Sequence, residues 1–246
     1  IGIENNMTLI DTAEMYGEGL AEELVGKAIK GYDREKLFLV SKVYPHNAGR
    51  RNIFRSCENT LKRMGVEYLD LYLLHWRGAV PLSETVECME ELVKKGKIKR
   101  WGVSNFDIDD MKELMTVKDG DKCVVNQVLY HLGSRGIEYS LYPWMKEHNI
   151  PVMAYCPMAQ GAGLKHELMT NKELIKISEK YDLSIPELLL AFVLQKDNII
   201  AIPRTSNPQH ALRNAKVADV KIDEGDLEIM DREFPAPDRK VYLDIV

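Results

Sequence analysis

Short apolar runs alternate along the whole chain with segments whose apolar residues recur at helical spacing. Runs of four to eight apolar residues are typical of buried strands, and apolar positions three or four residues apart are typical of helices that pack on one face. Ile53, Cys57, Leu61 and Met64 show the helical spacing. The pattern predicts strands in the runs TLIDTA, LFLVSK, YLDLYLLH, IKRWGVSN, CVVNQVLYH, IPVMAYCP and IIAIPRT.

The predicted helices begin and end at residues that commonly cap helices. Serine, aspartate and asparagine side chains can accept hydrogen bonds from the first free N–H groups of a helix. The expected N-terminal caps are Ser83, Asp107, Ser184 and Asn207. The expected C-terminal glycines are Gly31, Gly65 and Gly96. Strands that alternate with helices in this way are typical of βα units and a parallel sheet.

Two architectures are built from such units, an open doubly wound sheet and a closed (β/α)8 barrel. In an open sheet the ligand-binding residues gather at one switch point, whereas in a barrel they follow strand after strand. Polar residues follow every predicted strand here: Asp11, Lys42, His75, Ser104 with Asn105, Gln127, Tyr155, and Arg204 with Thr205. This series favours the barrel.

A closed barrel of this type has eight strands, one more than the pattern shows. The opening IGIENNM has the character of the end of a helix followed by a turn. We therefore expect an α/β protein with a (β/α)8 barrel, in which one strand and most of one helix come before Ile1. Residues 1–246 are expected to form a single domain.

Composition limits the classes of function. Hydrophobic residues make up 45% and charged residues 29% of the 246 residues, as in an ordinary globular protein. A net charge of -5 argues against a nucleic-acid partner, which requires a basic face. There is no Cys-x-x-Cys pair, no apolar run of the roughly 20 residues that span a membrane, and no signal peptide. These features predict a cytoplasmic protein without a membrane partner, and a monomer.

The stretch TLIDTAEMYGEGLAEE places two glycines at a predicted helix start. It is not a dinucleotide-binding fingerprint, because the third glycine of G-x-G-x-x-G would fall at Glu22. Glu18, Glu22 and Glu23 also bring negative charge to the helix N-terminus, where it suits the helix dipole but repels a phosphate.

Asp11, Tyr16, Lys42 and His75 could together donate a proton to a carbonyl group. A tyrosine phenol ordinarily has a pKa of about 10, so stabilising its anion near neutral pH requires about 4 kcal/mol. A lysine ammonium about 4 Å away supplies that much at an effective dielectric constant near 20. Asp11 can balance the lysine charge, and His75 can hydrogen-bond the carbonyl oxygen.

Metal-dependent hydrolysis is the competing use of aspartate and histidine at strand ends. It requires several histidines, typically with a His-x-His pair, and the six histidines of this chain include no such pair. The residues therefore favour proton donation, and no metal is expected.

Motifs that span nearly the whole chain carry a family resemblance: LIDTAEMYGEG, SKV, YLDLYLLHW, RWGVSNF, VNQVLYH, MAYCPMAQG and IPRTSNPQHALRN. With these motifs in this order the chain resembles the aldo-keto reductases, and most of all their compact bacterial members. These are NAD(P)H-dependent carbonyl reductases built on a (β/α)8 barrel. The resemblance implies a catalytic tetrad in which Tyr16 is the general acid, Lys42 assists its ionisation, Asp11 pairs with Lys42, and His75 orients the carbonyl.

The resemblance also implies a site for NADPH. Ser104, Asn105 and Gln127 would hold the nicotinamide carboxamide, and Tyr155 would stack on the ring. The pyrophosphate would lie along the backbone near Cys156, Met158 and Gln160. The 2'-phosphate end would meet Arg204, Thr205, Ser206, His210, Arg213 and Asn214.

Position 210 departs from the family pattern, because NADPH-preferring members usually have arginine there. A neutral imidazole loses a charge-assisted contact with the phosphate. Arg213 lies one helical turn further on and could replace that contact. We expect NADPH to remain preferred because Arg204 is present, with NADH as the alternative cofactor.

Tyr44 and Trp76 each follow a tetrad residue and are expected to line the substrate entrance, whereas His131 and the Cys156 side chain are expected to be structural. The connection after His75 is short, and the chain ends soon after FPAPDRK, which implies a shallow pocket for small carbonyl compounds. The expected function is NADPH-dependent reduction of small aldehydes and ketones to alcohols. The alternative is a cofactor-binding subunit that senses redox state and turns over slowly.

Overall fold

The structure is a computed structural model that describes residues 1–245. The chain divides into two compact units. The N-terminal unit comprises Met7–Asn126, and the C-terminal unit comprises Ile1–Asn6 together with the described chain from Gln127 onward.

Each predicted apolar run contains one strand, which confirms all of the predicted strands. They are β1 (Leu9–Asp11), β2 (Phe38–Val43), β3 (Leu71–Leu74), β4 (Trp101–Ser104), β5 (Asn126–Leu129), β6 (Val152–Tyr155) and β7 (Ile199–Ile202). The strand order follows the sequence, and the pairs β1–β2, β2–β3, β3–β4 and β6–β7 are parallel. Burial explains the apolar character, since every residue of β3, β4 and β5 is buried.

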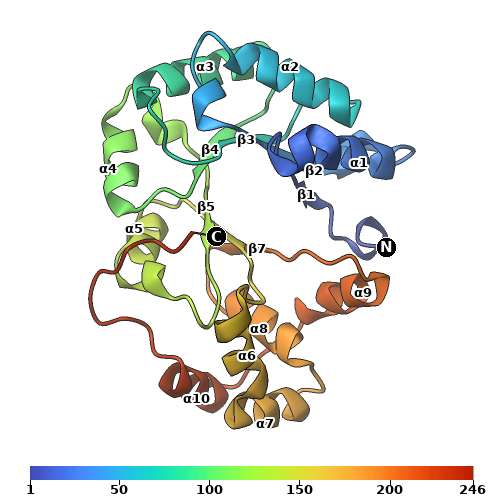
Figure 1. Ribbon diagram of the computed structural model, residues 1–246, viewed down its shortest axis with the longest axis vertical. Coiled ribbons are helices and arrows are strands. Elements are labelled where there is room, and N and C mark those ends of the chain that lie inside the picture. The colour runs from blue at the N-terminus through green and yellow to red at the C-terminus, as the bar shows by residue number, and fades with distance from the viewer. Residues whose placement is uncertain (246) are drawn as a thin grey trace. The chain divides into compact units, whose positions relative to one another are not determined.

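The helices of the N-terminal unit lie outside its strands (Figure 1). They are η2 (Tyr16–Gly19), α1 (Leu20–Ile29), η3 (Arg34–Lys36), η4 (Pro45–Asn47), α2 (Ile53–Met64), α3 (Leu82–Lys94), α4 (Ile108–Thr116) and η5 (Gly120–Lys122). Helix α2 buries Ile53, Cys57, Leu61 and Met64, the positions that define its predicted face. Its polar face remains toward water, so the helix is held by one apolar stripe.

The C-terminal unit has more helices than strands. Its helices are η1 (Ile3–Asn5), η6 (Gly136–Tyr139), α5 (Leu141–Glu147), α6 (Ala162–Thr170), α7 (Lys172–Lys180), α8 (Ile185–Leu194), α9 (Pro208–Val217) and α10 (Glu224–Glu233). Helix α8 packs against β7, α7 and α9. It is buried along nearly its whole length, which explains why its sequence is apolar on all sides.

Most of the predicted caps are confirmed, and one is wrong. Asp107 and Ser184 form capping boxes, and Asn207 accepts a hydrogen bond from the backbone of Gln209. Ser83 is not a cap: α3 begins at Leu82, and the carbonyl of Pro81 accepts the first backbone hydrogen bonds. The fixed backbone of proline is suited to the helix entry, so Ser83 lies within the first turn.

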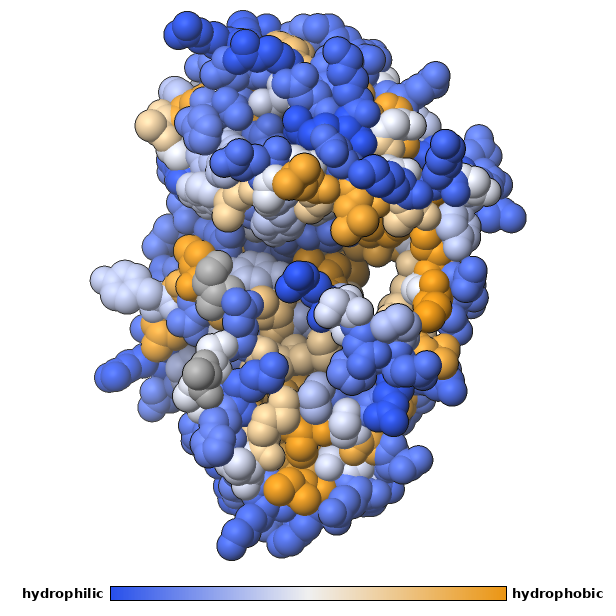
Figure 2. Space-filling view, turned by 45° about the vertical axis from the view of Figure 1, so that its right-hand side comes forward, coloured by the Kyte–Doolittle hydropathy of each residue, from blue (hydrophilic) through white to orange (hydrophobic). Residues whose placement is uncertain are grey.

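Hydrophilic residues make up most of the molecular face shown in Figure 2. Within residues 1–245, every helix is too short or too polar to cross a lipid bilayer.

Candidate active site

Three neighbouring strands of the N-terminal unit bring Asp11, Lys42 and His75 to one edge of the sheet. Asp11 is the last residue of β1, and its register partner on β2 is Val40, two residues before Lys42. Lys42 lies opposite Leu73 of β3, and the backbone N–H of His75 donates to Val43. Tyr16 begins η2 in the loop that follows β1.

The ammonium group of Lys42 is the centre of this cluster. The side chain is fully buried, and Nζ lies 2.6 Å from Oδ1 of Asp11, 2.9 Å from the carbonyl of Thr12 and 3.2 Å from the hydroxyl oxygen of Tyr16. These contacts use all three of its N–H donors. Asp11 balances the buried charge, and an ammonium at this distance can stabilise negative charge on the phenol oxygen.

Tyr16 is accessible from solvent. It is 37% exposed, whereas Lys42 behind it is 0% exposed. Its loop turns sharply through left-handed backbone at Gly17, Glu18 and Gly19, with φ values of 59°, 54° and 94°. A molecule from solvent can therefore reach the phenol of Tyr16, whereas the Lys42 ammonium next to it is shielded from water.

His75 lies next to Tyr16 in a site that keeps its imidazole neutral. The two ring centroids are 5.7 Å apart, with the rings nearly perpendicular. Burial and the nearby Lys42 charge lower the pKa of His75 to about 3. Nδ1 has no hydrogen-bond partner among the described residues. At neutral pH the ring therefore has a single N–H, which suits hydrogen bonding to a carbonyl oxygen.

Ser104 and Asn105 follow β4 and lie beside this cluster. The side-chain amide of Asn105 donates to the backbone carbonyl of His75 at 3.1 Å and to the hydroxyl of Ser104 at 3.3 Å. The Asn105 backbone has a φ of 58°, a left-handed conformation that asparagine tolerates better than most residues. Hydroxyl and amide groups offer both donors and acceptors, as binding of a nicotinamide carboxamide requires.

The aromatic residues expected at the substrate entrance lie side by side. The ring of Trp76 is 4.8 Å from His75 and 5.8 Å from Tyr44, measured between centroids. His46, which sequence reasoning missed, packs against Tyr44 at 4.7 Å. Together Tyr44, His46 and Trp76 form an aromatic wall next to His75.

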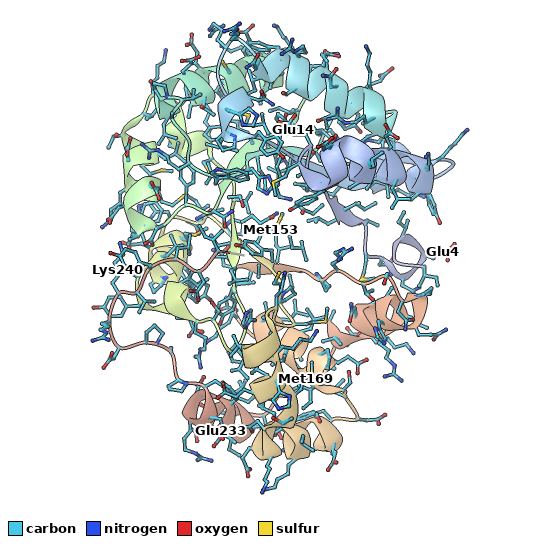
Figure 3. All side chains as sticks on the ribbon, viewed as in Figure 1. Glu4, Glu14, Met153, Met169, Glu233 and Lys240 are labelled. Atoms are coloured by element: carbon cyan, nitrogen blue, oxygen red, sulfur yellow. The ribbon has the colours of Figure 1, made fainter. Side chains whose placement is uncertain are left out.

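The first predicted cofactor residues of the C-terminal unit lie at the ends of β5 and β6. Gln127 is buried, and its amide is 2.8 Å from the sulfur of Met153, which Figure 3 labels. Tyr155 ends β6 and is partly buried. The thiol of Cys156 lies 2.8 Å from the side-chain oxygen of Gln160.

The backbone after β6 forms a tight loop. Cys156 and Ala159 have positive φ values of 51° and 63°, and Met158 between them is partly buried. The backbone N–H of Ala159 donates to the carbonyl of Cys156, which closes the loop, and left-handed turns of this kind can form concave sites for anions. That geometry fits the expected contact with a pyrophosphate.

The remaining predicted cofactor residues surround the first turns of α9. Thr205 accepts a hydrogen bond from the backbone of Asn207, and Asn207 caps the helix. Arg204, Ser206 and His210 are exposed, and Asn214 is buried. A helix N-terminus beside an arginine suits a phosphate group. Arg213, in contrast, lies 3.8 Å from the carboxylate of Glu187, which engages it in an ion pair.

One buried carboxylate near the tetrad has partners that the sequence did not predict. Glu22 lies in the first turn of α1, as predicted, and its side chain is fully buried. It accepts hydrogen bonds from Ser41 and Arg63, each at 2.5 Å. Gly19 lies against the same arginine, since a Cβ there would be 2.6 Å from Cδ of Arg63. The spacing along the chain contains no signal for these contacts.

Within residues 1–245 no three histidine, cysteine, aspartate or glutamate side chains are grouped so as to hold a metal ion.

Sequence comparison identifies the family. A model of the Aldo/keto reductase family matches residues 3–233. The methylglyoxal reductase YeaE of Escherichia coli (strain K12) is 49% identical over 245 residues, which cover 100% of this chain and 86% of that protein. The glyoxal reductase of Bacillus subtilis (strain 168) is 34% identical over 98% of this chain and 86% of its own length.

Comparison with solved structures agrees. The crystal structure of an aldo-keto reductase from Klebsiella pneumoniae in complex with NADPH matches with a TM-score of 0.97 and 50% identity, over 100% of this chain and 86% of that one. This match confirms the predicted (β/α)8 barrel as the fold class. The resemblance seen in the motifs is also confirmed, and the chain is an oxidoreductase that belongs to the aldo/keto reductase family.

Proposed function

We propose that the protein reduces small aldehydes and ketones to alcohols with NADPH, and that 1,2-dicarbonyl compounds such as methylglyoxal and glyoxal are among its substrates. The observation that supports this most strongly is the contact of the Lys42 ammonium with both Asp11 and the Tyr16 hydroxyl. Relatives named methylglyoxal reductase and glyoxal reductase support the substrate class. The NADPH complex of the Klebsiella pneumoniae relative supports the cofactor.

In this reaction each tetrad residue has one task. NADPH, when bound, supplies the hydride that the carbonyl carbon receives. Tyr16 gives its proton to the carbonyl oxygen, and Lys42 stabilises the phenolate that remains. His75 donates a hydrogen bond to the same oxygen, which orients the substrate and favours the developing negative charge. Asp11 holds Lys42 in position and balances its charge.

The cofactor residues of the N-terminal unit are Ser104 and Asn105, which we assign to the nicotinamide carboxamide. The buried hydroxyl of Ser104 and the anchored amide of Asn105 support this assignment. In the C-terminal unit we assign Gln127 to the carboxamide and Tyr155 to stacking on the ring. The tight backbone at Cys156, Met158 and Gln160 is assigned to the pyrophosphate.

For the phosphate end of the cofactor the assignment rests on charge. Arg204 is exposed beside the N-terminus of α9, where an anion is favoured. The assigned group is Arg204, Thr205, Ser206, His210, Arg213 and Asn214. Because Glu187 pairs with Arg213, Arg204 supplies most of the positive charge, and we expect NADPH to bind more tightly than NADH.

We further propose that residues 1–246 act as one catalytic domain, as a monomer in the cytoplasm. The family match runs through both units, which supports a single domain. The four cysteines are all free thiols, which is the usual state in a reducing compartment.

The test is the NADPH-dependent reduction of methylglyoxal by the wild-type protein and by Tyr16→Phe. We expect the loss of nicotinamide absorbance to slow by at least about a hundredfold in the variant, because the proton donor is gone. NADPH binding, followed by fluorescence, should be unchanged, since Lys42 and the residues assigned to the cofactor remain. Equal turnover in the two proteins would remove Tyr16 from the mechanism. No turnover in either, with NADPH bound, would contradict the proposed reaction.

A further inference from the structure

Glu14 lies in the catalytic loop between Asp11 and Tyr16, but its side chain is directed to the next loop. Its Oε1 atom accepts a hydrogen bond from the backbone N–H of Tyr44 at 2.7 Å and from the side-chain amide of Asn47 at 3.2 Å. Its own backbone N–H donates to the carbonyl of Lys42. Glu14, labelled in Figure 3, thus connects the loop after β1 to the turn after β2.

That turn, Tyr44–Asn47, is held from two sides. It closes on itself through a 2.9 Å hydrogen bond from the backbone of Asn47 to the carbonyl of Tyr44. On one side Glu14 binds both of its ends. On the other side Gly78 packs so closely on Pro45 that a Cβ at position 78 would lie 2.4 Å from Cβ of Pro45.

The turn contributes two members of the aromatic wall. Tyr44 and His46 lie on it, and Tyr44 contacts Trp76 edge-on. Trp76 in turn packs against His75, whose ring is next to that of Tyr16. A shift of the turn therefore moves the wall relative to the groups that bind and protonate the carbonyl.

We propose that Glu14 is a positioning residue that holds the aromatic wall in place for the carbonyl substrate. The inference rests on the proposed function, since it concerns binding of the substrate of that reaction. Hydrogen bonds to a carboxylate are stronger than those between neutral groups, so a single side chain can fix both ends of a short turn. Glu14 touches neither the hydroxyl of Tyr16 nor the ammonium of Lys42 in any hydrogen bond of the described residues, so it acts through the turn.

This role predicts that loss of Glu14 changes KM for the carbonyl substrate but not kcat. Binding of the substrate against the wall is equally strong in the ground state and the transition state, so its loss raises KM and leaves kcat nearly unchanged. Binding of NADPH should also be unaffected, because the residues assigned to the cofactor follow β4, β5, β6 and β7, whereas the turn follows β2. A general loss of folded protein would instead lower kcat and leave KM unchanged.

The experiment compares three carboxylate variants, Glu14→Ala, Glu14→Gln and Glu23→Ala, with methylglyoxal and NADPH. We expect Glu14→Ala to raise KM for methylglyoxal about tenfold, with kcat within about twofold and NADPH affinity unchanged. Glu14→Gln retains an oxygen that can accept from Tyr44 and should stay within about threefold of the wild-type KM. Glu23 is exposed on α1, away from the turn. Glu23→Ala removes one negative charge, as Glu14→Ala does, and should leave KM and kcat at their wild-type values.

A second pair of variants tests the inference if Glu14→Ala fails to fold. Asn47→Asp places a carboxylate opposite Glu14 and should raise KM in the same way, because the two groups repel. The double variant Glu14→Gln/Asn47→Asp restores a donor and an acceptor, and KM should return toward the wild-type value. A wild-type KM in Glu14→Ala and Asn47→Asp, with Tyr16→Phe inactive, would overturn this inference and leave the proposed function intact. Absence of methylglyoxal reduction by the wild-type protein would instead overturn the proposed function.

Discussion

At the scale of single residues, the buried Lys42 is the group on which the arrangement of the tetrad depends. Its ammonium contacts three oxygen acceptors, which are the carboxylate of Asp11, the backbone carbonyl of Thr12 and the phenol of Tyr16. Burying an ammonium without such partners would cost several kcal/mol. The structure therefore holds the Lys42 ammonium at hydrogen-bond distance from the hydroxyl of Tyr16, the proposed proton donor, and keeps it away from water.

Lys42→Met tests this arrangement. The methionine side chain fills similar space but cannot stabilise the phenolate, so we expect kcat for methylglyoxal to fall by at least about a hundredfold. Asp11 would also lose its counter-charge. Kinetics at saturating NADPH measure the effect, with Lys27→Met as control, because Lys27 is exposed on α1. A decrease below tenfold would show that Tyr16 does not need the ammonium.

The sequence predicted that Asp11, Lys42 and His75 lie together because the strands that carry them were predictable. Once β1, β2 and β3 are parallel neighbours, Asp11, Lys42 and His75 must come to the same edge. The partners of Glu14 were not predictable in this way. They lie 30 and 33 residues away, and their contacts depend on how a loop folds rather than on a strand register.

At the scale of elements, a side-chain hydrogen bond connects α1 to β2, the strand that contains Lys42. Ser41 points to the opposite face of β2 from Lys42, as alternate residues of a strand do. There it donates to the buried Glu22 of α1, which also pairs with Arg63 of α2. The Glu22 carboxylate thus connects α1, α2 and β2 on the face of β2 opposite to Lys42, close to the loop on which Tyr16 lies.

Glu22→Ala should lower the free energy of unfolding by about 2 to 4 kcal/mol. The loss leaves Arg63 without its counter-charge and Ser41 without an acceptor, and it creates a cavity. Urea unfolding followed by circular dichroism measures the change. Glu23→Ala, on the exposed side of the same helix, should change the stability by less than about 0.5 kcal/mol. Equal effects of the two variants would mean that the buried contacts contribute nothing beyond helix propensity.

At the scale of the whole molecule, each of the two units holds one buried histidine that folding keeps neutral. In the N-terminal unit, burial and Lys42 lower the pKa of His75 to about 3. In the C-terminal unit, burial lowers the pKa of His131 to about 4, and the ring nitrogen Nδ1 accepts a hydrogen bond from the backbone of Gly133. The sequence predicted a structural role for His131, and it offered no sign of this shift because burial appears only in the folded chain.

These two histidines should make the protein less stable as the pH falls below about 6.5, the ordinary pKa of the unfolded side chain. Below that pH the two imidazoles bind protons in the unfolded chain but stay neutral in the folded chain. Lowering the pH therefore favours unfolding until it reaches the lowered pKa values. Each histidine then reduces the free energy of unfolding by up to about 1.4 kcal/mol per pH unit. Between pH 6.5 and 5 most carboxylates stay ionised, so they contribute little to the slope in this range.

Urea unfolding at pH 7.0, 6.0 and 5.0 separates the two contributions. His75→Asn and His131→Asn should each be less stable than the wild type at pH 7.0, because a packed ring is lost. In each single variant the free energy of unfolding should also fall less between pH 7.0 and 5.0 than in the wild type. The double variant should show the smallest decrease. His166→Asn, on the exposed surface of α6, should keep the wild-type slope. If the slope is the same in all four variants, the two rings take up protons over the same pH range in the folded and the unfolded chain, and burial does not lower their pKa values.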